Sequence, residues 1–129
     1  MSRYLLLDTH AAIWFFNGEN TLSETAKKAI LDTSNIKYLS IASAWEVAIK
    51  LSIGKLDIAG KTADFIQDAE ANGFIFVPIT AAHLTVLESL PMIHRDPFDR
   101  LLVATAIVEN MAIITADGNI ARYNVPYTW

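Results

Sequence analysis

The chain has 129 residues, of which 53% are hydrophobic and 19% are charged, and these values fit one folded domain over residues 1–129 rather than a disordered segment. The net charge of −4 argues against a protein that coats nucleic-acid phosphates with basic side chains, and the absence of cysteine excludes disulfides, catalytic thiolates and cysteine metal sites. The first apolar run ends after three leucines, whereas a signal peptide needs about 7 to 15 apolar residues and a membrane helix about 20. We therefore expect a cytoplasmic protein that does not enter a membrane.

Five short segments predict the strands of a sheet. In chain order they are YLLL (4–7), the weaker YLSI (38–41), FIFV (74–77), AIIT (112–115) and the tail VPYTW (125–129). Continuous apolar runs of this length are typical of strands that are buried on both faces. The proline in the tail excludes a central position, so we expect the tail at an edge of the sheet.

Helical patterns with recognisable ends lie between these strands. They cover residues 10–17, 22–32, 42–53 and 61–72, and two more follow Thr80 and Pro97. The tetrapeptide TLSE (21–24) is predicted to be a capping box at the start of the second helix. Strands that alternate with helices pair in parallel through right-handed crossovers, which predicts an α/β sandwich.

Two of the predicted strands are followed by an aspartate. Asp8 comes directly after the first strand, and Asp117 comes shortly after the strand at 112–115. Ligands of an open parallel sheet gather beyond the carboxyl ends of its strands, so both carboxylates are candidate site residues. The alternatives are that Asp8 only caps the following helix and that Asp117 and Gly118 form a plain turn.

A third acid, Glu46, lies within the helix SAWEVAIKL, where nearly all of its neighbours are apolar. A buried carboxylate in such a helix would need a partner or a metal ion. The alternative is an exposed ion pair with Lys50, one helical turn further on, which would contribute only about a few tenths of a kcal/mol.

The stretch HRDPFDRLLVATA (94–106) holds a fourth candidate. Asp96 and Pro97 have the pattern of an N-cap followed by proline at the first helical position. Asp99 then falls in the first turn, at the end of an apolar stripe, where a carboxylate must be solvated, paired or metal-bound. Arg100 is not explained by helix capping, because a cation in the first turn opposes the helix dipole and its own face is apolar.

Other polar and aromatic residues carry weaker signals. The three histidines, His10, His83 and His94, share no metal-ligand spacing, and we interpret them as structural. At least two of the three consecutive aromatic residues at 14–16 are expected in the core, and a third could mark a groove for a partner.

Four segments, LLLDTHAAIWF, SAWEVAIK, HRDPFDRLLVATA and ITADGNI, together resemble the four signature blocks of PIN-domain ribonucleases, specifically the VapC-type toxins of prokaryotic toxin–antitoxin pairs. The blocks occur in the right order and extend over nearly the whole chain. The resemblance implies a three-layer α/β/α sandwich around a parallel sheet of strand order 3-2-1-4-5.

The resemblance also implies an acidic pocket for Mg²⁺ or Mn²⁺, formed by Asp8, Glu46, Asp99 and Asp117. Mg²⁺ prefers oxygen ligands, and we expect Asp8 and Asp99 to bind it directly and Asp117 to bind it directly or through water. Glu46 would orient the attacking water or act as base. Thr115, Asp96 and Arg100 match positions that support such a site, with Arg100 either holding the carboxylates apart or reaching toward phosphate.

The partners implied by the resemblance are an RNA substrate, a second copy of the chain in a homodimer, and a separate antitoxin protein. The helices at 10–17 and 22–32 carry more apolar residues than one face of a sheet needs. We expect part of that surface to form a groove for a short antitoxin segment, and we expect the antitoxin to offer an arginine or lysine to the acidic pocket.

Three other functions have to be weighed. A receiver-like signalling domain also has an acidic Mg²⁺ pocket, but it needs a lysine after the last strand, and the tail RYNVPYTW has none. A catalytically inactive PIN scaffold and a metal phosphohydrolase acting on small molecules are the others. Metal-dependent cleavage of RNA, compared with cleavage of nucleotides, would distinguish all three from a ribonuclease.

Overall fold

The computed structural model describes residues 3–56, 58 and 60–129, and these form an alternating series of strands and helices. The strands are β1 (Tyr4–Leu7), β2 (Ile36–Ser40), β3 (Ile75–Val77), β4 (Ala112–Ile114) and β5 (Tyr127–Thr128). The helices are α1 (Thr9–Phe16), α2 (Glu24–Leu31), α3 (Ile41–Ser52), α4 (Thr62–Ala71), α5 (Ala81–Ser89), α6 (Pro97–Glu109) and the short α7 (Gly118–Ala121).

All strand pairs are parallel, and the order across the sheet is β3-β2-β1-β4-β5. The predicted α/β class and the strand order 3-2-1-4-5 are therefore confirmed. The central strand β1 is hydrogen-bonded to β2 on one side and to β4 on the other, with Leu6 opposite Tyr38 and Ile113. The tail forms the edge strand β5, as its proline predicted.

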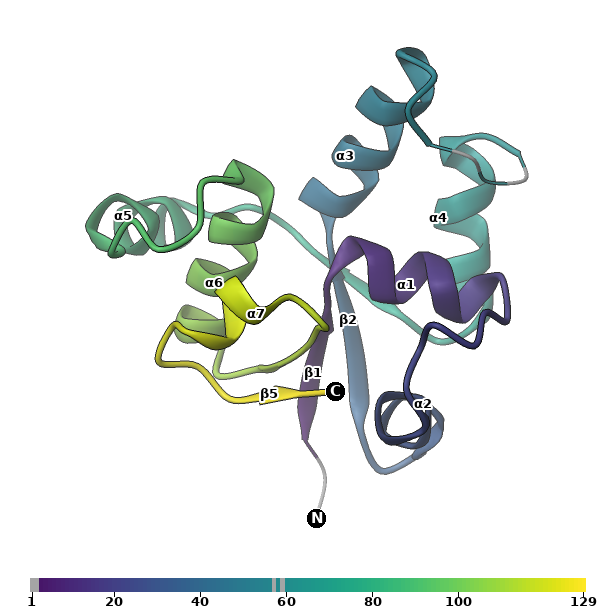
Figure 1. Cartoon of the computed structure of the whole chain (residues 1–129), viewed down its shortest axis with the longest axis horizontal. Coiled ribbons are helices and arrows are strands. Elements are labelled where there is room, and N and C mark those ends of the chain that lie inside the picture. The colour runs from purple at the N-terminus through teal and green to yellow at the C-terminus, as the bar shows by residue number, and fades with distance from the viewer. Residues whose placement is uncertain (1–2, 57, 59) are drawn as a thin grey trace.

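The alternation of side chains along the buried strands creates two hydrophobic cores, one on each face of the sheet. Leu5 and Leu7 point into the larger core, which contains residues of α1 to α4, and Leu6 points into the smaller one, which contains residues of α6 and α7. Figure 1 shows the same division, with α1 to α4 on one side of β1 and β2 and α5 to α7 on the other. The two central strands β1 and β4 are covered on both faces from Leu5 to Leu7 and from Ala112 to Ile114, and their sequences are accordingly continuously apolar.

The start of α2 differs from the prediction. Ser23, rather than Thr21, is the N-cap: its hydroxyl accepts a hydrogen bond from the backbone N–H of Ala26, and Glu24 is the first helical residue. The capping box predicted at Thr21 was therefore wrong. Thr21 and Ser23 both carry the hydroxyl group of a typical N-cap, and the helix begins directly after the second of them.

The three consecutive aromatic residues of α1 are all half-buried and pack against the larger core. Phe16 lies edge-on to Phe65 of α4 and to Phe74, with ring centroids 5.6 Å apart in both pairs. Trp14 packs against Trp129 at the end of the chain. The expectation that at least two of the three belong to the core agrees with this packing.

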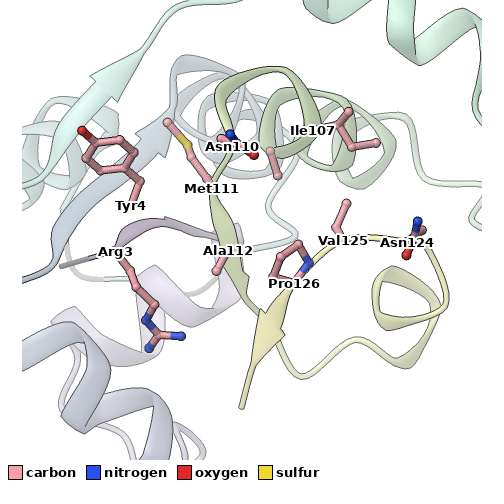
Figure 2. A pocket seen from close by; sticks show the side chains of 10 residues that line it. Arg3, Tyr4, Ile107, Asn110, Met111, Ala112, Asn124, Val125 and Pro126 are labelled. Atoms are coloured by element: carbon pink, nitrogen blue, oxygen red, sulfur yellow. The ribbon is translucent and has the colours of Figure 1, made fainter. Parts of the chain in front are cut away.

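A cavity of about 520 Å³ opens at the amino ends of β1 and β4. Its lining includes Tyr4, Ile107, Met111 and Ala112, and among the described residues that line it Arg3 is the only charged one (Figure 2). The cavity therefore lies at the edge of the sheet opposite to the predicted acidic site. Within the described part of the chain, no helix has both the length and the apolar character needed to cross a membrane.

Candidate active site

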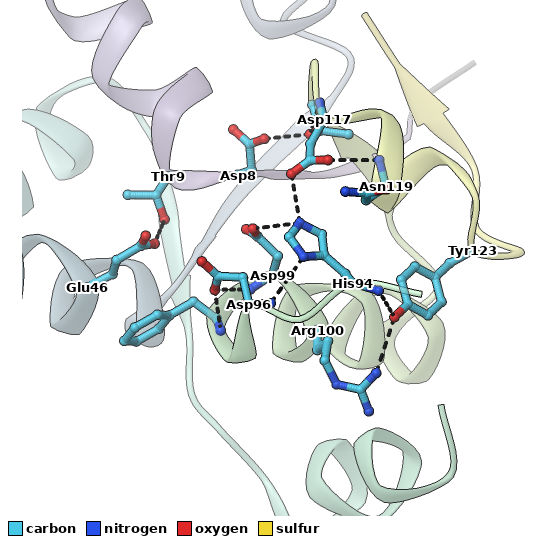
Figure 3. Close-up of polar contacts among 12 residues, drawn as sticks. Asp8, Thr9, Glu46, His94, Asp96, Asp99, Arg100, Asp117, Asn119 and Tyr123 are labelled. Carbon is cyan, nitrogen blue, oxygen red and sulfur yellow. Dashed lines mark hydrogen bonds and ion pairs between the residues drawn. The ribbon is translucent and has the colours of Figure 1, made fainter. Parts of the chain in front are cut away.

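The four predicted acids come from four separate segments and meet at the carboxyl edge of the sheet (Figure 3). Asp8 follows β1 and Asp117 follows β4, whereas Glu46 and Asp99 lie in α3 and in the first turn of α6. Their proximity has electrostatic consequences, because Asp8 and Glu46 both contribute to a raised pKa of Asp99. The parallel topology explains the meeting, since it brings the carboxyl ends of β1 and β4 together.

Asp8 caps a helix and is also part of this cluster. Its Oδ1 accepts a hydrogen bond of 2.7 Å from the backbone N–H of Ala11, and its Oδ2 accepts one from the hydroxyl of Thr115. Only 6% of the residue is exposed. Burial raises the pKa of Asp8 above its usual value, although both hydrogen bonds favour the ionised form. The two interpretations of Asp8 are therefore compatible, because one oxygen makes the cap and the other faces the site.

Thr115 connects two of the acids. Its hydroxyl donates to Asp8 and accepts a hydrogen bond of 2.9 Å from the backbone N–H of Asp117. Asp117 in turn caps α7 by accepting from the N–H of Asn119 at 2.8 Å. Partial burial alone would raise the pKa of Asp117, but hydrogen bonds from His94 and Asn119 outweigh it and lower the pKa below its usual value.

Glu46 is buried, with 3% of the residue exposed. Its Oε1 accepts a hydrogen bond of 2.7 Å from the hydroxyl of Thr9, and its Oε2 pairs with Lys50 at 2.6 Å. The pair with Lys50 was the alternative explanation of Glu46, and it exists, but it does not lie on an exposed face as that explanation required. Thr9 fixes the carboxylate from α1 and was not singled out from the sequence.

Asp99 is the least compensated of the four acids. Burial, followed by repulsion from Asp96, raises its pKa to about 7, and Glu46 and Asp8 add to the repulsion. Asp96 is the N-cap of α6, as predicted, because its Oδ1 accepts from the backbone N–H groups of Phe98 and Asp99. The cap thus places one carboxylate beside another and increases the negative charge of the site.

His94 lies within the cluster, so the interpretation of this residue as merely structural was wrong. Its Nε2 lies 2.8 Å from Asp117 Oδ2 and 3.1 Å from Asp99 Oδ2. No local pattern indicated this contact, because His94 and Asp117 are 23 residues apart and no metal-ligand spacing relates them. His83, by contrast, is fully buried between Thr80 and Glu109 and has the expected structural position.

The sequence matches the family described as PIN domain over residues 5–126, which is nearly the whole chain. The chain belongs to the PIN-domain family. It is 28% identical over 128 residues to Ribonuclease VapC22 of Mycobacterium tuberculosis, and the match covers 95% of this chain and 93% of that protein. The resemblance of the four sequence blocks to PIN-domain proteins is therefore confirmed.

Solved structures of low sequence identity share this PIN fold. The VapBC2 complex of Rickettsia felis, bound to a DNA fragment from its promoter, superposes with a TM-score of 0.71 at 14% identity and covers 98% of both chains. A toxin–antitoxin complex from Klebsiella pneumoniae superposes with a TM-score of 0.69 at 16% identity, covering 97% of this chain and 96% of the other.

The acidic cluster fits the divalent cation implied by the PIN fold. Ligand atoms of His94, Asp99 and Asp117 all lie within 4.8 Å of one another, and Asp8 is joined to Asp117 through Thr115. Carboxylate oxygens are the donors that hard divalent cations prefer. Burial, followed by repulsion from Asp96, raises the pKa of Asp99, and a cation bound beside it would favour its ionised form.

Arg100 does not point into the PIN-domain acidic pocket, and both roles expected for it were wrong. Its guanidinium donates to the backbone carbonyls of Leu87 and Pro91 and to the hydroxyl of Tyr123, at 3.0 to 3.2 Å. The residue is buried, with 9% exposed. Arg100 therefore joins α6 to the last turn of α5 and to the segment after it, and it supports the site only by holding these parts in place.

Proposed function

We propose that this PIN-domain protein is a metal-dependent endoribonuclease and acts as the toxin of a toxin–antitoxin pair. The observation that carries the proposal is the convergence of four carboxylates from four segments on one edge of the sheet, two of them almost fully buried. Each buried carboxylate costs desolvation free energy, and neighbouring carboxylates also repel one another. A buried cluster of them therefore indicates a function that requires it, such as binding of a metal ion. The 28% identity to Ribonuclease VapC22 supports the choice of RNA as substrate.

Each acid has a proposed role. Asp8 and Asp99 would bind Mg²⁺ or Mn²⁺ directly, and Asp117 would bind it directly or through water. The cation would supply charge neutralisation at the phosphate and a lowered pKa for water. Glu46, whose carboxylate is fixed by Thr9 and Lys50, would orient the attacking water or accept its proton. Thr115 keeps Asp8 and Asp117 at a fixed separation.

Each of the three alternative functions is disfavoured by a particular observation. Receiver domains have the strand order 2-1-3-4-5, which differs from the order of this sheet. An inactive scaffold would not need the buried network around Glu46, and a hydrolase of small molecules would need an enclosed pocket at the acids. The cavity of about 520 Å³ lies at the other edge of the sheet.

Incubation of the purified protein with a panel of structured RNAs and a panel of nucleotides, with Mg²⁺, Mn²⁺ or EDTA, tests the nuclease proposal. We expect internal cleavage of RNA that EDTA stops, and no turnover of nucleotides. The substitution Glu46→Gln provides the inactive control, because it keeps the hydrogen bond from Thr9 and removes the base. Nucleotide hydrolysis without RNA cleavage would contradict the proposal.

We also propose that an antitoxin binds in the depression between α1 and α2. Trp14, Phe15 and Leu22 contribute apolar surface to this shallow hollow, whose volume is about 70 Å³, and Glu24 and Lys27 lie at its rim. Solved structures that share the fold include toxin–antitoxin complexes. An apolar helix or extended peptide fits such a surface, and an arginine or lysine of the same partner would pair with the acids and compete with the cation.

Expression of the chain alone in its host, followed by purification, tests the toxin and partner proposals. We expect growth arrest when the chain is expressed alone. When the neighbouring genes are present, we expect a small protein to copurify with it. Excess Mg²⁺ should then partly restore the RNA cleavage that this small protein inhibits. A harmless chain that copurifies with no small protein would contradict the toxin proposal and leave the nuclease proposal standing.

Light scattering during gel filtration tests the homodimer, for which we expect twice the mass of 14.3 kDa.

A further inference from the structure

The hydrogen bonds of His94 fix the position of its ring proton. The backbone N–H of Asp96 donates to His94 Nδ1 at 3.1 Å. A backbone amide can only donate, so Nδ1 must accept and carries no proton. The single proton of the neutral ring is therefore on Nε2, the nitrogen that faces Asp117 Oδ2 at 2.8 Å and Asp99 Oδ2 at 3.1 Å.

A histidine that binds a metal ion presents the lone pair of an unprotonated nitrogen. His94 presents an N–H group to the carboxylates instead, so in this orientation it is not a metal ligand. A half-turn of the ring would place a carbon opposite the N–H of Asp96 and break that hydrogen bond. The backbone N–H of His94 is also held by the hydroxyl of Tyr123 at 3.0 Å, and only 12% of its side chain is exposed.

The N–H group of His94 lies between the oxygens of two acids that are expected to bind the cation (Figure 3). We propose that His94 is a placeholder for the cation: it cross-links Asp99 and Asp117 in the metal-free protein and must release them when the metal binds. His94 and the metal ion thus compete for the same carboxylate oxygens. The inference rests on the proposed function, because it takes these acids as metal ligands.

Competition and ligation predict opposite effects of removing the side chain. If His94 competes, His94→Ala should bind Mn²⁺ about tenfold more tightly than the wild type, since the hydrogen bond to Asp117 and the contact with Asp99 no longer oppose binding. His94→Gln, whose amide can still donate to the acids, should stay closer to the wild type. If His94 is a ligand, His94→Ala should weaken binding instead, and that result would overturn the inference.

Isothermal titration calorimetry with Mn²⁺ at pH 8 provides this comparison. Arg95→Ala is the matched control, because it removes an exposed cation at the next position and leaves the ring in place. We expect its affinity to stay within about twofold of the wild type. A tenfold gain in Arg95→Ala, or unchanged affinity in His94→Ala, would also overturn the inference, because either result would mean that the hydrogen bonds of His94 do not oppose metal binding.

Nitrogen NMR of the histidine rings in the wild-type protein gives a second test that needs no folded variant. We expect the metal-free spectrum to show His94 protonated at Nε2, and Mg²⁺ to shift this signal without moving the proton to Nδ1. A proton on Nδ1 in the Mg²⁺-loaded protein would identify His94 as a ligand. Absence of any metal binding by the wild type would overturn the proposed function as well, whereas RNA cleavage with unchanged affinity in His94→Ala would overturn the placeholder role alone.

Discussion

The two edges of the sheet differ in character: the amino edge has a large cavity, and the carboxyl edge has the cluster of acids that forms the candidate site. The amino edge has a cavity of about 520 Å³ with a single charged residue, Arg3, in its lining. The carboxyl edge has four acids: Thr115 joins Asp8 to Asp117 by hydrogen bonds, and Glu46 is held separately by Thr9 and Lys50. The fourth acid, Asp99, lies 3.1 Å from His94 Nε2. In this protein the candidate site is marked by desolvated charge, and the volume of a cavity is a poor guide to it.

The difference follows from the direction of the strands. In a parallel sheet every strand enters its following helix at the same edge, so helix N-termini and their caps gather there. Asp8, Asp96 and Asp117 all cap helices at the carboxyl edge. The first-turn N–H groups and the dipoles of α1 and α6 favour negative charge at this edge.

The largest effect we expect is the loss of RNA cleavage when an acid of the carboxyl edge is neutralised. Asp8→Asn, Glu46→Gln, Asp99→Asn and Asp117→Asn should each lower the rate by about a hundredfold or more, since each removes a proposed metal contact or the base. Gel assays with a labelled RNA measure the rate, and circular dichroism checks the fold. Full activity of Asp99→Asn would break the assignment of the site to this edge.

A large gain in stability is expected for Asp99→Asn in EDTA. Its pKa of about 7 in the folded protein exceeds the ordinary value of 3.8, so protonation favours the folded state. The stability contributed by that proton is complete below pH 3.8 and is lost as the pH rises to about 7, by at most about 4 kcal/mol. Asparagine resembles the neutral carboxyl group, so the variant should melt several degrees higher than the wild type at pH 8.

The same melting curves at lower pH sharpen this result. The difference between Asp99→Asn and the wild type should shrink steadily as the pH falls from 8 to 4, because the wild-type carboxyl group becomes neutral as well. Equal melting temperatures at pH 8 would mean that Asp99 is not crowded by its neighbours. Addition of Mg²⁺ should stabilise the wild type more than the variant, since only the wild type keeps the full set of ligands.

A moderate loss of stability is expected for Arg100→Met. The variant keeps an apolar stem but removes the three hydrogen bonds that the guanidinium donates to the carbonyls of Leu87 and Pro91 and to the hydroxyl of Tyr123, which should cost about 1 to 3 kcal/mol. Urea unfolding measures the loss. The cleavage rate per folded molecule should fall far less than in the acid variants, because the guanidinium points away from the acids. A rate loss as large as that of Asp99→Asn would place Arg100 in the site after all.

The smallest effect is expected at the amino edge. Ile107→Ala removes a half-exposed apolar side chain from the lining of the large cavity. We expect its cleavage rate to stay within about twofold of the wild type and its stability within about 1 kcal/mol. A strong loss of activity in this variant would mean that the two edges are not functionally distinct.

The fold and the four acids could be predicted from the sequence because their signals are local. The strand at 4–7 is continuously apolar, and the alternation of strands with helices dictates parallel pairing. Asp8 follows a strand directly and Asp117 follows one shortly after its end, which places both at the carboxyl edge of such a sheet. The N-cap role of Asp96 also follows from its neighbour Pro97.

The contacts of His94, Arg100 and Thr9 were decided only by the tertiary structure. Each contacts residues far away in the sequence: His94 bonds to Asp117, Arg100 to Tyr123, and Thr9 to Glu46. Arg95 and Arg100 belong to one short segment, and nothing in the local sequence indicates which of the two side chains faces a pocket. The packing of α6 against α5 and the segment after it turns Arg100 toward backbone carbonyls, and the N–H of Asp96 turns His94 toward the acids. Local sequence specifies which groups are present at the carboxyl edge, and the long-range hydrogen bonds decide where each group points.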